Sequence, residues 1–285
     1  MPKKNREQKS QKLEQQTNLQ NNEIEGDGNL LTFGGHLEVF RQMLFRILGV
    51  AGLIAVVIFC FKETTWEVLL APSEWDFCTY SLLESAMQII GIDFHFEEYH
   101  VNLIATDLSS QFMTHITTAV YLGVLGASPY ILYELFRFIS PALYENERKY
   151  SVQVTGIIYA LFLLGVLMSY FVLFPISFRF LGTYSVSAKV VSNITLDSYI
   201  STFVSLTLIM GVVFQLPVIA FFLGKLGIVT SNMLAKYRKH SILVIMLVAA
   251  IITPPDLMTL ILVTIPLYLL YEVSIHVVSW VEPKE

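Results

Sequence analysis

The sequence predicts an all-α, polytopic membrane protein with six transmembrane helices and with both its N-terminus and its C-terminus in the cytoplasm. Composition is the first reason: 54% of the 285 residues are hydrophobic and 14% are charged, whereas a soluble globular chain is about 25% charged. The mean hydropathy of +0.61 agrees with this. The second reason is that the charged residues cluster between long apolar runs, as expected if those runs cross the hydrocarbon of a bilayer.

The chain begins with a polar tail, residues 1–30, which is rich in Lys, Gln, Asn and Glu and has no apolar periodicity. We expect this tail to be disordered and cytoplasmic. It also lacks the apolar core of a cleavable signal peptide. Residues 31–281 are predicted to form a six-helix membrane domain, followed by a short polar end.

Six apolar segments follow the tail. A helix needs about 20 residues to cross about 30 Å of hydrocarbon. They lie near Leu44–Phe61, Gln111–Phe136, Tyr150–Ile176, Tyr199–Gly224, Ser241–Thr253 and Leu257–Trp280. An acidic and aromatic external loop, residues 62–110, separates the first two segments. Within it, Ser81–Ile90 has the pattern of a short amphipathic helix, for which a solvated cap is favoured over a specific binding role.

The last two segments, residues 241–280, are predicted to be short helices separated by the breaker Thr253-Pro254-Pro255-Asp256. The fifth segment has about 13 residues, and a helix of that length spans about 20 Å. Such a mismatch favours local thinning of the bilayer or association with a partner. The alternative is that this hairpin is buried in a helix bundle and shielded from lipid.

The placement of Lys and Arg predicts the orientation. Basic residues are concentrated before the first segment and in the loops that follow the second and fourth segments, whereas the loop 62–110 contains only Lys62. The positive-inside rule then places both termini in the cytoplasm. The even number of segments agrees with this orientation.

Three polar positions within or at the ends of the apolar segments stand out, because a charge at the bilayer centre costs about 2.5–3.5 kcal/mol. We interpret Glu134 and Glu272 first as interfacial carboxylates that reach water or a neighbouring Arg. Gln215 lies in the middle of the fourth segment. An interhelical hydrogen bond and a functional role are both open for this residue.

The sequence offers no sign of catalysis, of a metal site or of a cofactor site. It contains no GxSxG motif, no P-loop and no paired intramembrane Asp, and its six His lack metal-binding spacing. An enzyme is therefore not expected. A small-solute secondary transporter is the alternative from another class, but no repeated halves are visible and no ionised residue lies near the middle of a segment.

The loop that follows the second segment, residues 138–149, places Glu145 and Glu147 close to Arg148 and Lys149 and to aromatic side chains. A carboxylate binds a guanidinium by two parallel hydrogen bonds. This loop is therefore a plausible acceptor for a basic peptide with an apolar continuation. Taken alone, the pattern is better explained as a set of charges that neutralise one another at the headgroups.

Several motifs, in this order, resemble those of the TatC family, the polytopic core of the twin-arginine protein translocase. They are His36–Arg41, Ile104–Asp107, Ser128–Tyr133, Phe138–Arg148 and Thr253–Asp256. The resemblance covers about Thr32 to Trp280. Six spans with cytoplasmic termini also agree with it.

This resemblance implies a receptor for signal peptides that carry two consecutive Arg on folded cargo, at the cytoplasmic membrane face. The family's recognition Glu corresponds to Glu147. The other implied signal-peptide-binding residues are Phe138, Pro141, Tyr144, Leu37, Glu38 and Arg41. The family's N-terminal Glu position holds Val39 here, and Glu38 lies one residue earlier, which is about 100° around a helix.

The resemblance also implies partners and a setting. Gln215 stands where many members of the family carry an intramembrane Glu, and Pro254, Pro255 and Asp256 complete the implied partner-binding positions. The partners are TatA/TatB-like single-span proteins, and the active complex is a homo-oligomer in the bacterial cytoplasmic membrane. Export is driven by the transmembrane proton gradient, without a cofactor and without nucleic acid.

Overall fold

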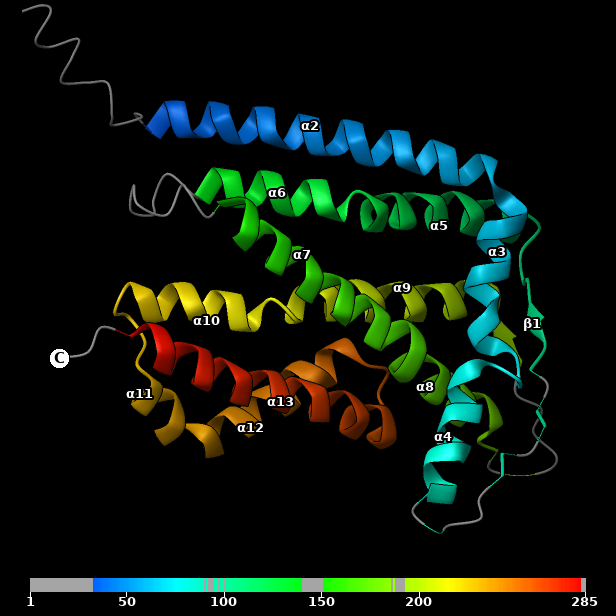
Figure 1. Ribbon diagram of the computed structural model, residues 1–285. Helices are drawn as coiled ribbons and strands as arrows, with labels where there is room; N and C mark the ends of the chain where they lie inside the picture. Colours follow the sequence, from blue (N-terminus) through cyan, green and yellow to red (C-terminus); the bar gives the residue numbers. More distant parts are fainter. Residues whose placement is uncertain are drawn as a thin grey trace, which may run out of the picture. The chain divides into compact units, whose positions relative to one another are not determined.

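The computed structural model describes residues 33–89, 91, 95–96, 98–99, 101–139, 151–185, 187 and 193–282. The chain forms two compact units, Met1–Gly49 and Val50–Glu285. In the first unit, the described residues belong to α2 (Phe33–Cys60), a helix of 28 residues that continues into the second unit. The described residues of the second unit are mainly helical (Figure 1).

All six predicted apolar segments are helical. In order, they are α2, α5 (Ser110–Gly126) with α6 (Ser128–Ile139), α7 (Ser151–Met168) with the π-helical turn η4 (Ser169–Leu173) and α8 (Phe174–Thr183), α9 (Leu196–Val213) with α10 (Leu216–Lys225), α12 (Arg238–Ile252), and α13 (Leu257–Val281). Among the described residues, four spans are long and apolar enough to cross a membrane, or five if the bent α5–α6 pair is one span. The chain is thus an all-α, polytopic membrane protein.

The two C-terminal segments differ in length. Helix α12 has 15 residues, so it is the short fifth segment that the sequence predicts. Helix α13 has 25 residues, and the prediction of a short sixth helix is wrong. Pro266 lies inside α13 without ending it, because a proline in a membrane helix is tolerated where neighbouring groups satisfy the freed carbonyl.

Prolines explain why three spans are interrupted. A proline has no amide hydrogen, so it leaves the carbonyl four residues earlier without its helical donor. Pro129 follows the 52° bend between α5 and α6, and Pro217 follows the break between α9 and α10. Pro175 follows η4, and the hydroxyl of Thr79 donates to the freed carbonyl of Phe171.

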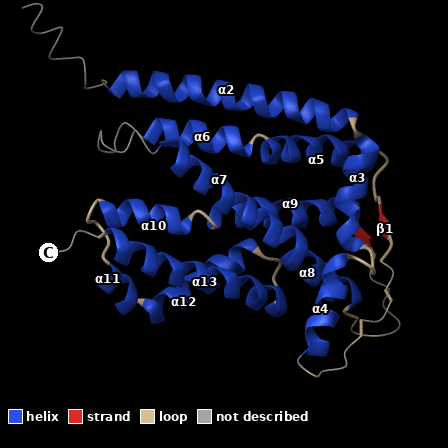
Figure 2. Ribbon diagram, in the orientation of Figure 1, coloured by secondary structure: helices blue, strands red, loops and turns tan. Residues whose placement is uncertain are grey.

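The predicted external loop, residues 62–110, is largely folded. It contains α3 (Lys62–Leu70), the 3₁₀ turn η1 (Ala71–Ser73), α4 (Cys78–Ile89) and β1 (Leu103–Ile104). The predicted amphipathic helix at Ser81–Ile90 is present as α4 and begins three residues earlier. Strand β1 pairs in parallel with β2 (Ile194–Thr195), which closes this region against the segment before α9 (Figure 2).

Tyrosine hydroxyls attach α3 to the membrane helices. Tyr170 donates to Val68 O at 2.7 Å, and Tyr199 donates to Leu69 O at 2.7 Å. Both acceptors are carbonyls in the last turn of α3, which have no partner within the helix. The two tyrosines therefore cap α3 and fix its end over η4 and α9.

An arginine surrounded by aromatic rings holds α4 against α8. The guanidinium carbon of Arg179 lies 5.0 Å, 4.5 Å and 4.6 Å from the ring centroids of Tyr80, Phe96 and Tyr99, respectively, within the range of a cation–π interaction. Burial raises the pKa of Tyr80 well above its ordinary value. Its hydroxyl thus stays protonated and donates to Pro175 O at 2.9 Å.

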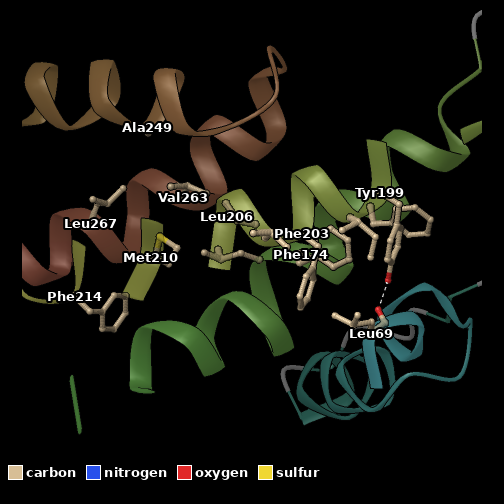
Figure 3. Close-up of a cluster of buried hydrophobic side chains, with 14 of the residues drawn as sticks. Leu69, Phe174, Tyr199, Phe203, Leu206, Met210, Phe214, Ala249, Val263 and Leu267 are labelled. Atoms are coloured by element: carbon tan, nitrogen blue, oxygen red, sulfur yellow. Dashed lines mark hydrogen bonds between the residues drawn. The ribbon is translucent and has the colours of Figure 1, made fainter. Parts of the chain in front are cut away.

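The apolar core is centred on α9, which packs against α7, α5, η4 and α12. Figure 3 shows part of this cluster, including Leu69, Phe174, Tyr199, Phe203, Leu206, Met210, Val263 and Leu267. Glycines allow α7 to approach α9 closely. A Cβ at Gly165 would lie 2.6 Å from Met210 O, and one at Gly211 would lie 2.6 Å from the Phe162 ring. Small residues at such crossings are typical of membrane helices.

Candidate functional site

The N-terminal part of α2 carries the predicted residues Leu37, Glu38 and Arg41. The carboxylate of Glu38 accepts a bond from Gln42 Nε2 at 3.2 Å and lies 3.2 Å from Arg41 Nη2. Both partners lie on the same helix, three and four residues onward, where side chains meet. Leu37 and Val39 are exposed. Glu38 is therefore an exposed carboxylate that already has a cationic partner.

The end of α6 carries Phe138, which is half-buried. One turn earlier, Glu134 is 5% exposed, and its Oε1 accepts from the Tyr130 hydroxyl at 3.0 Å. Arg137 Nη1 lies 4.0 Å from the same oxygen. The interpretation of Glu134 as a carboxylate beside a neighbouring Arg is confirmed. Tyr130 lies in the Ser128–Tyr133 motif, but the sequence alone did not indicate its pairing with Glu134, although a spacing of four residues is a helical contact.

The remaining predicted residues of the peptide-binding loop, Pro141, Tyr144 and Glu147, lie outside the described residues. So does Glu145. Their assignment stays a prediction that the sequence supports.

Gln215 lies at the break between α9 and α10. Its Nε2 donates to Ile158 O on α7 at 3.1 Å, so the interhelical hydrogen bond considered for this residue is present. Its Oε1 is buried and has no hydrogen-bond partner among the described residues. An unpaired buried carbonyl oxygen is unfavourable in an apolar setting, so Gln215 has capacity for one further donor.

The turn of residues 253–256 links α12 to α13. Asp256 is the N-cap of α13, and its Oδ1 accepts from Thr259 N at 2.7 Å. Thr253 is the C-cap of α12 with an extended backbone, and its hydroxyl donates to Ala249 O at 3.0 Å. Pro254 and Pro255 occupy the two positions between the helices. Every residue of this motif thus has a local structural role, whatever partner it contacts.

A polar clamp holds α11 (Ser231–Lys236) and the start of α12 against α13, which runs beside α10 (Figure 1). Glu272 Oε2 lies 2.8 Å from Arg238 Nη2, and its Oε1 accepts from Tyr268 at 2.9 Å. This confirms the interpretation of Glu272 as a carboxylate that reaches a neighbouring Arg. The clamp fixes the position of the short helix α12 at this end.

Glu282 completes the clamp and was not anticipated from the sequence. Its carboxylate accepts from the Ser231 hydroxyl at 2.6 Å and from the Ser231 amide at 2.7 Å. These two bonds hold the pKa of Glu282 below its ordinary value. In the sequence, Glu282 is visible only as a carboxylate directly after the last apolar segment, and this position does not indicate Ser231 as its partner.

No group of three or more His, Cys, Asp or Glu side chains within the described ranges is arranged to hold a metal ion. The polar groups of these ranges are instead helix caps, interhelical hydrogen bonds and ion pairs at helix ends. Such an arrangement positions the helices relative to one another.

Comparison with known proteins identifies the family. The sequence matches the family described as Sec-independent protein translocase protein (TatC) over residues 35–266. The chain belongs to the TatC family. It is 32% identical to the Sec-independent protein translocase protein TatC of Blattabacterium sp. subsp. Periplaneta americana, over 92% of this chain and 100% of that protein.

Other relatives and a solved structure agree with this membership. The chain is 40% identical to TatCy of Bacillus subtilis over 63% of this chain and 70% of that protein. It is also similar to a crystal structure of the twin arginine translocase receptor TatC, with a TM-score of 0.68 and 29% identity, covering 86% of this chain and 99% of that one. The TatC family is a family of protein translocase components with membrane-spanning helices.

Proposed function

We propose that this TatC protein is the core receptor subunit of the twin-arginine, Sec-independent translocase. It binds twin-Arg signal peptides of folded proteins at the cytoplasmic face. The observation that carries the proposal is the match to the family over residues 35–266, together with the likeness to a solved twin arginine translocase receptor over nearly the full length of that chain.

The proposed peptide site combines Glu147 with a second carboxylate, Glu38 or Glu145. The apolar part of the peptide lies along the first two spans. The contact between Glu38 and Arg41 affects whether Glu38 is available as the second carboxylate. A peptide guanidinium that binds both oxygens of Glu38 competes with Arg41 for Oε1, and this exchange costs little because an exposed ion pair is weak.

The proposed partners are TatA/TatB-like single-span proteins, which dock on the α12–α13 hairpin, in an active complex with several copies of this chain. Support comes from the length of α12, because 15 residues span about 23 Å against about 30 Å of hydrocarbon. Lengthening α12 by about two turns should abolish transport if this mismatch matters.

The proposed location is the bacterial cytoplasmic membrane, with both termini inside. The energy source is the transmembrane proton gradient, since the sequence contains no nucleotide-binding motif. The protein is a receptor and translocase subunit and not an enzyme.

Site-specific cross-linking tests the receptor proposal. A twin-Arg peptide with a photo-reactive group is bound to the wild-type protein and to Glu147→Ala, and both are checked for folding by their melting curves. We expect Glu147→Ala to lose most of the cross-link and to melt as the wild type does. Glu98→Ala, which removes an exposed carboxylate of the external region, is the matched control. Cross-linking of Glu147→Ala at the wild-type level contradicts the proposed site.

A further inference from the structure

Helix α4 has one face that the rest of the chain leaves uncovered. On the opposite face, the buried side chains Thr79 and Tyr80 contact η4 and α8. None of the exposed side chains of α4 carries a charge: they are Cys78, Ser81, Leu82, Ser85, Gln88 and Ile89. A helix that faces water usually carries charged and polar residues on its outer face. The uncovered face of α4 is therefore unusual for a solvated helix.

The apolar side chains of this face form one narrow strip, which consists of Cys78, Leu82 and Ile89. At about 100° per residue, the three lie within about 40° of one another around the helix. Leu82 is 67% exposed and Ile89 is 87% exposed. Gln88 lies about 100° from Ile89, so the strip has a polar flank. This is the pattern of a helix that lies in a membrane interface.

The polar groups beside the strip bond within the protein. The hydroxyl of Ser81 donates to Cys78 O at 2.9 Å, and that of Ser85 donates to Ser81 O at 2.8 Å. The only charged residue in the sequence of α4 is Glu84, whose carboxylate accepts from the amide of Phe96 at 2.7 Å. These groups already have partners, so an apolar neighbour of the strip does not leave them unsatisfied.

The position of α4 along the membrane helices places it at the level of the headgroups. The span Val154–Thr183 has 30 residues, about 45 Å, and exceeds about 30 Å of hydrocarbon by about 15 Å. Arg179, near its end, is the only charged residue in this span, and an Arg in this position reaches the headgroups. Its guanidinium carbon lies 5.0 Å from the ring centroid of Tyr80 on α4. Trp75, three residues before α4, is exposed, and Trp is enriched at this level of a membrane.

Helix α4 packs against the side of η4 and α8, not against the end of α8. The hydroxyl of Thr79 donates to Phe171 O, and that of Tyr80 donates to Pro175 O. Phe171, Pro175 and Arg179 are four residues apart and so lie on one side of their helix. Figure 1 shows α4 running across the direction of α5 and α9. The strip faces away from α8, toward whatever surrounds the helices at this level.

We infer that α4 is an interfacial helix whose strip inserts into the headgroup–acyl boundary of the lipid bilayer. In the predicted topology α4 is external, so the outer leaflet receives it. A second protein is a poorer occupant, because a stable interface takes about 20–30 residues on each side and the strip offers three side chains. Leu83 of α4 and Met258 at the start of α13 line one pocket. The anchor therefore also influences the depth of this end of the α12–α13 hairpin, a role separate from peptide binding.

Spin labels on neighbouring positions of α4 test this inference. The full chain, with both natural cysteines replaced by Ser, receives one new cysteine and a nitroxide label in Leu82→Cys, Ile89→Cys, Ser81→Cys or Gln88→Cys. Each variant is placed in nanodiscs of phosphatidylethanolamine and phosphatidylglycerol. Collisions with oxygen, which is enriched in lipid, are compared with collisions with a water-soluble nickel complex. We expect the labels at Leu82 and Ile89 to favour oxygen and those at Ser81 and Gln88 to favour nickel.

Two other outcomes overturn the inference. If all four labels favour nickel, α4 is a solvated cap. If the labels at Leu82 and Ile89 collide rarely with both reagents and show spin–spin broadening, a second copy of the chain covers the strip.

A pair of charge variants tests the anchor by its effect on α4. Ile89→Glu and Gln88→Glu add the same charge in the last turn of α4, but only Ile89→Glu places it in the strip. Amide hydrogen exchange of α4 in nanodiscs should rise about tenfold in Ile89→Glu and stay near the wild type in Gln88→Glu. An equal rise in both variants would attribute the effect to a negative charge at the end of a helix and contradict the anchor.

Discussion

Arg238 Nη2 lies 2.8 Å from Glu272 Oε2, so the first residue of α12 is joined to the fifth turn of α13. Both side chains are partly exposed, so the pair contributes at most about 1 kcal/mol. Arg238→Glu should lower the melting temperature by about 2–4 °C, because it replaces attraction with repulsion. The double exchange Arg238→Glu with Glu272→Arg should restore most of this loss.

The control for this prediction is Lys239→Glu, which makes the same change of charge at the next, exposed position. Its melting temperature should stay near that of the wild type. Equal loss in Arg238→Glu and Lys239→Glu would show that net charge, and not the contact with Glu272, decides the stability.

The close approach of α7 to α9 gives a second prediction. A Cβ at Gly165 would lie 2.6 Å from Met210 O, and a backbone atom cannot rotate away. Gly165→Ala should therefore destabilise the protein by about 1–3 kcal/mol, measured by thermal unfolding in detergent. Gly156→Ala on the same helix, where no atom lies within 4 Å of the new Cβ, should have no such effect. Similar melting of the two variants would contradict the packing.

The positions of the membrane helices could be predicted because apolar runs and prolines are local features. Pro129, Pro175 and Pro217 explain where the spans break, and each is visible in the sequence. Apart from the amphipathic helix near residues 81–90, the fold of residues 62–110 could not be predicted. Helix α3 is capped by Tyr170 and Tyr199, which lie more than 100 residues later in the chain.

The site shows the same division between local and distant contacts. The pair of Glu38 with Arg41 has helical spacing, and the sequence placed both residues in the site without pairing them. The pair of Glu282 with Ser231 joins residues 51 positions apart, and no periodicity indicates such a partner. The distance from Gln215 to Ile158 likewise depends on how α7 and α9 pack.

Two substitutions at Asp256 distinguish its role as a helix cap from a role in partner binding. Its Oδ1 accepts from Thr259 N at 2.7 Å, and replacing an N-cap by Ala costs about 1 kcal/mol. Asp256→Ala should lower the melting temperature. Asp256→Asn keeps a capping oxygen and should melt as the wild type does. If Asp256→Asn also exports a folded twin-Arg reporter normally, the carboxylate charge has no role in partner binding.

Gln215 gives the last prediction. It joins α9–α10 to α7 through Ile158 O, while its Oε1 stays available to one further donor. Gln215→Leu should impair export of a folded twin-Arg reporter in cells that depend on this protein. The loss of stability should be small, because an interhelical hydrogen bond in a membrane is worth about 0.6 kcal/mol.

The matched control is Thr207→Val, which removes another interhelical polar contact of α9, the one with Ser169. Both variants should lose similar stability, but only Gln215→Leu should lose export. Unchanged export by Gln215→Leu would show that Gln215 has only a structural role. Equal loss of export in both variants would attribute the effect to the stability of α9, since a weakened helix crossing lowers the amount of folded protein in the membrane.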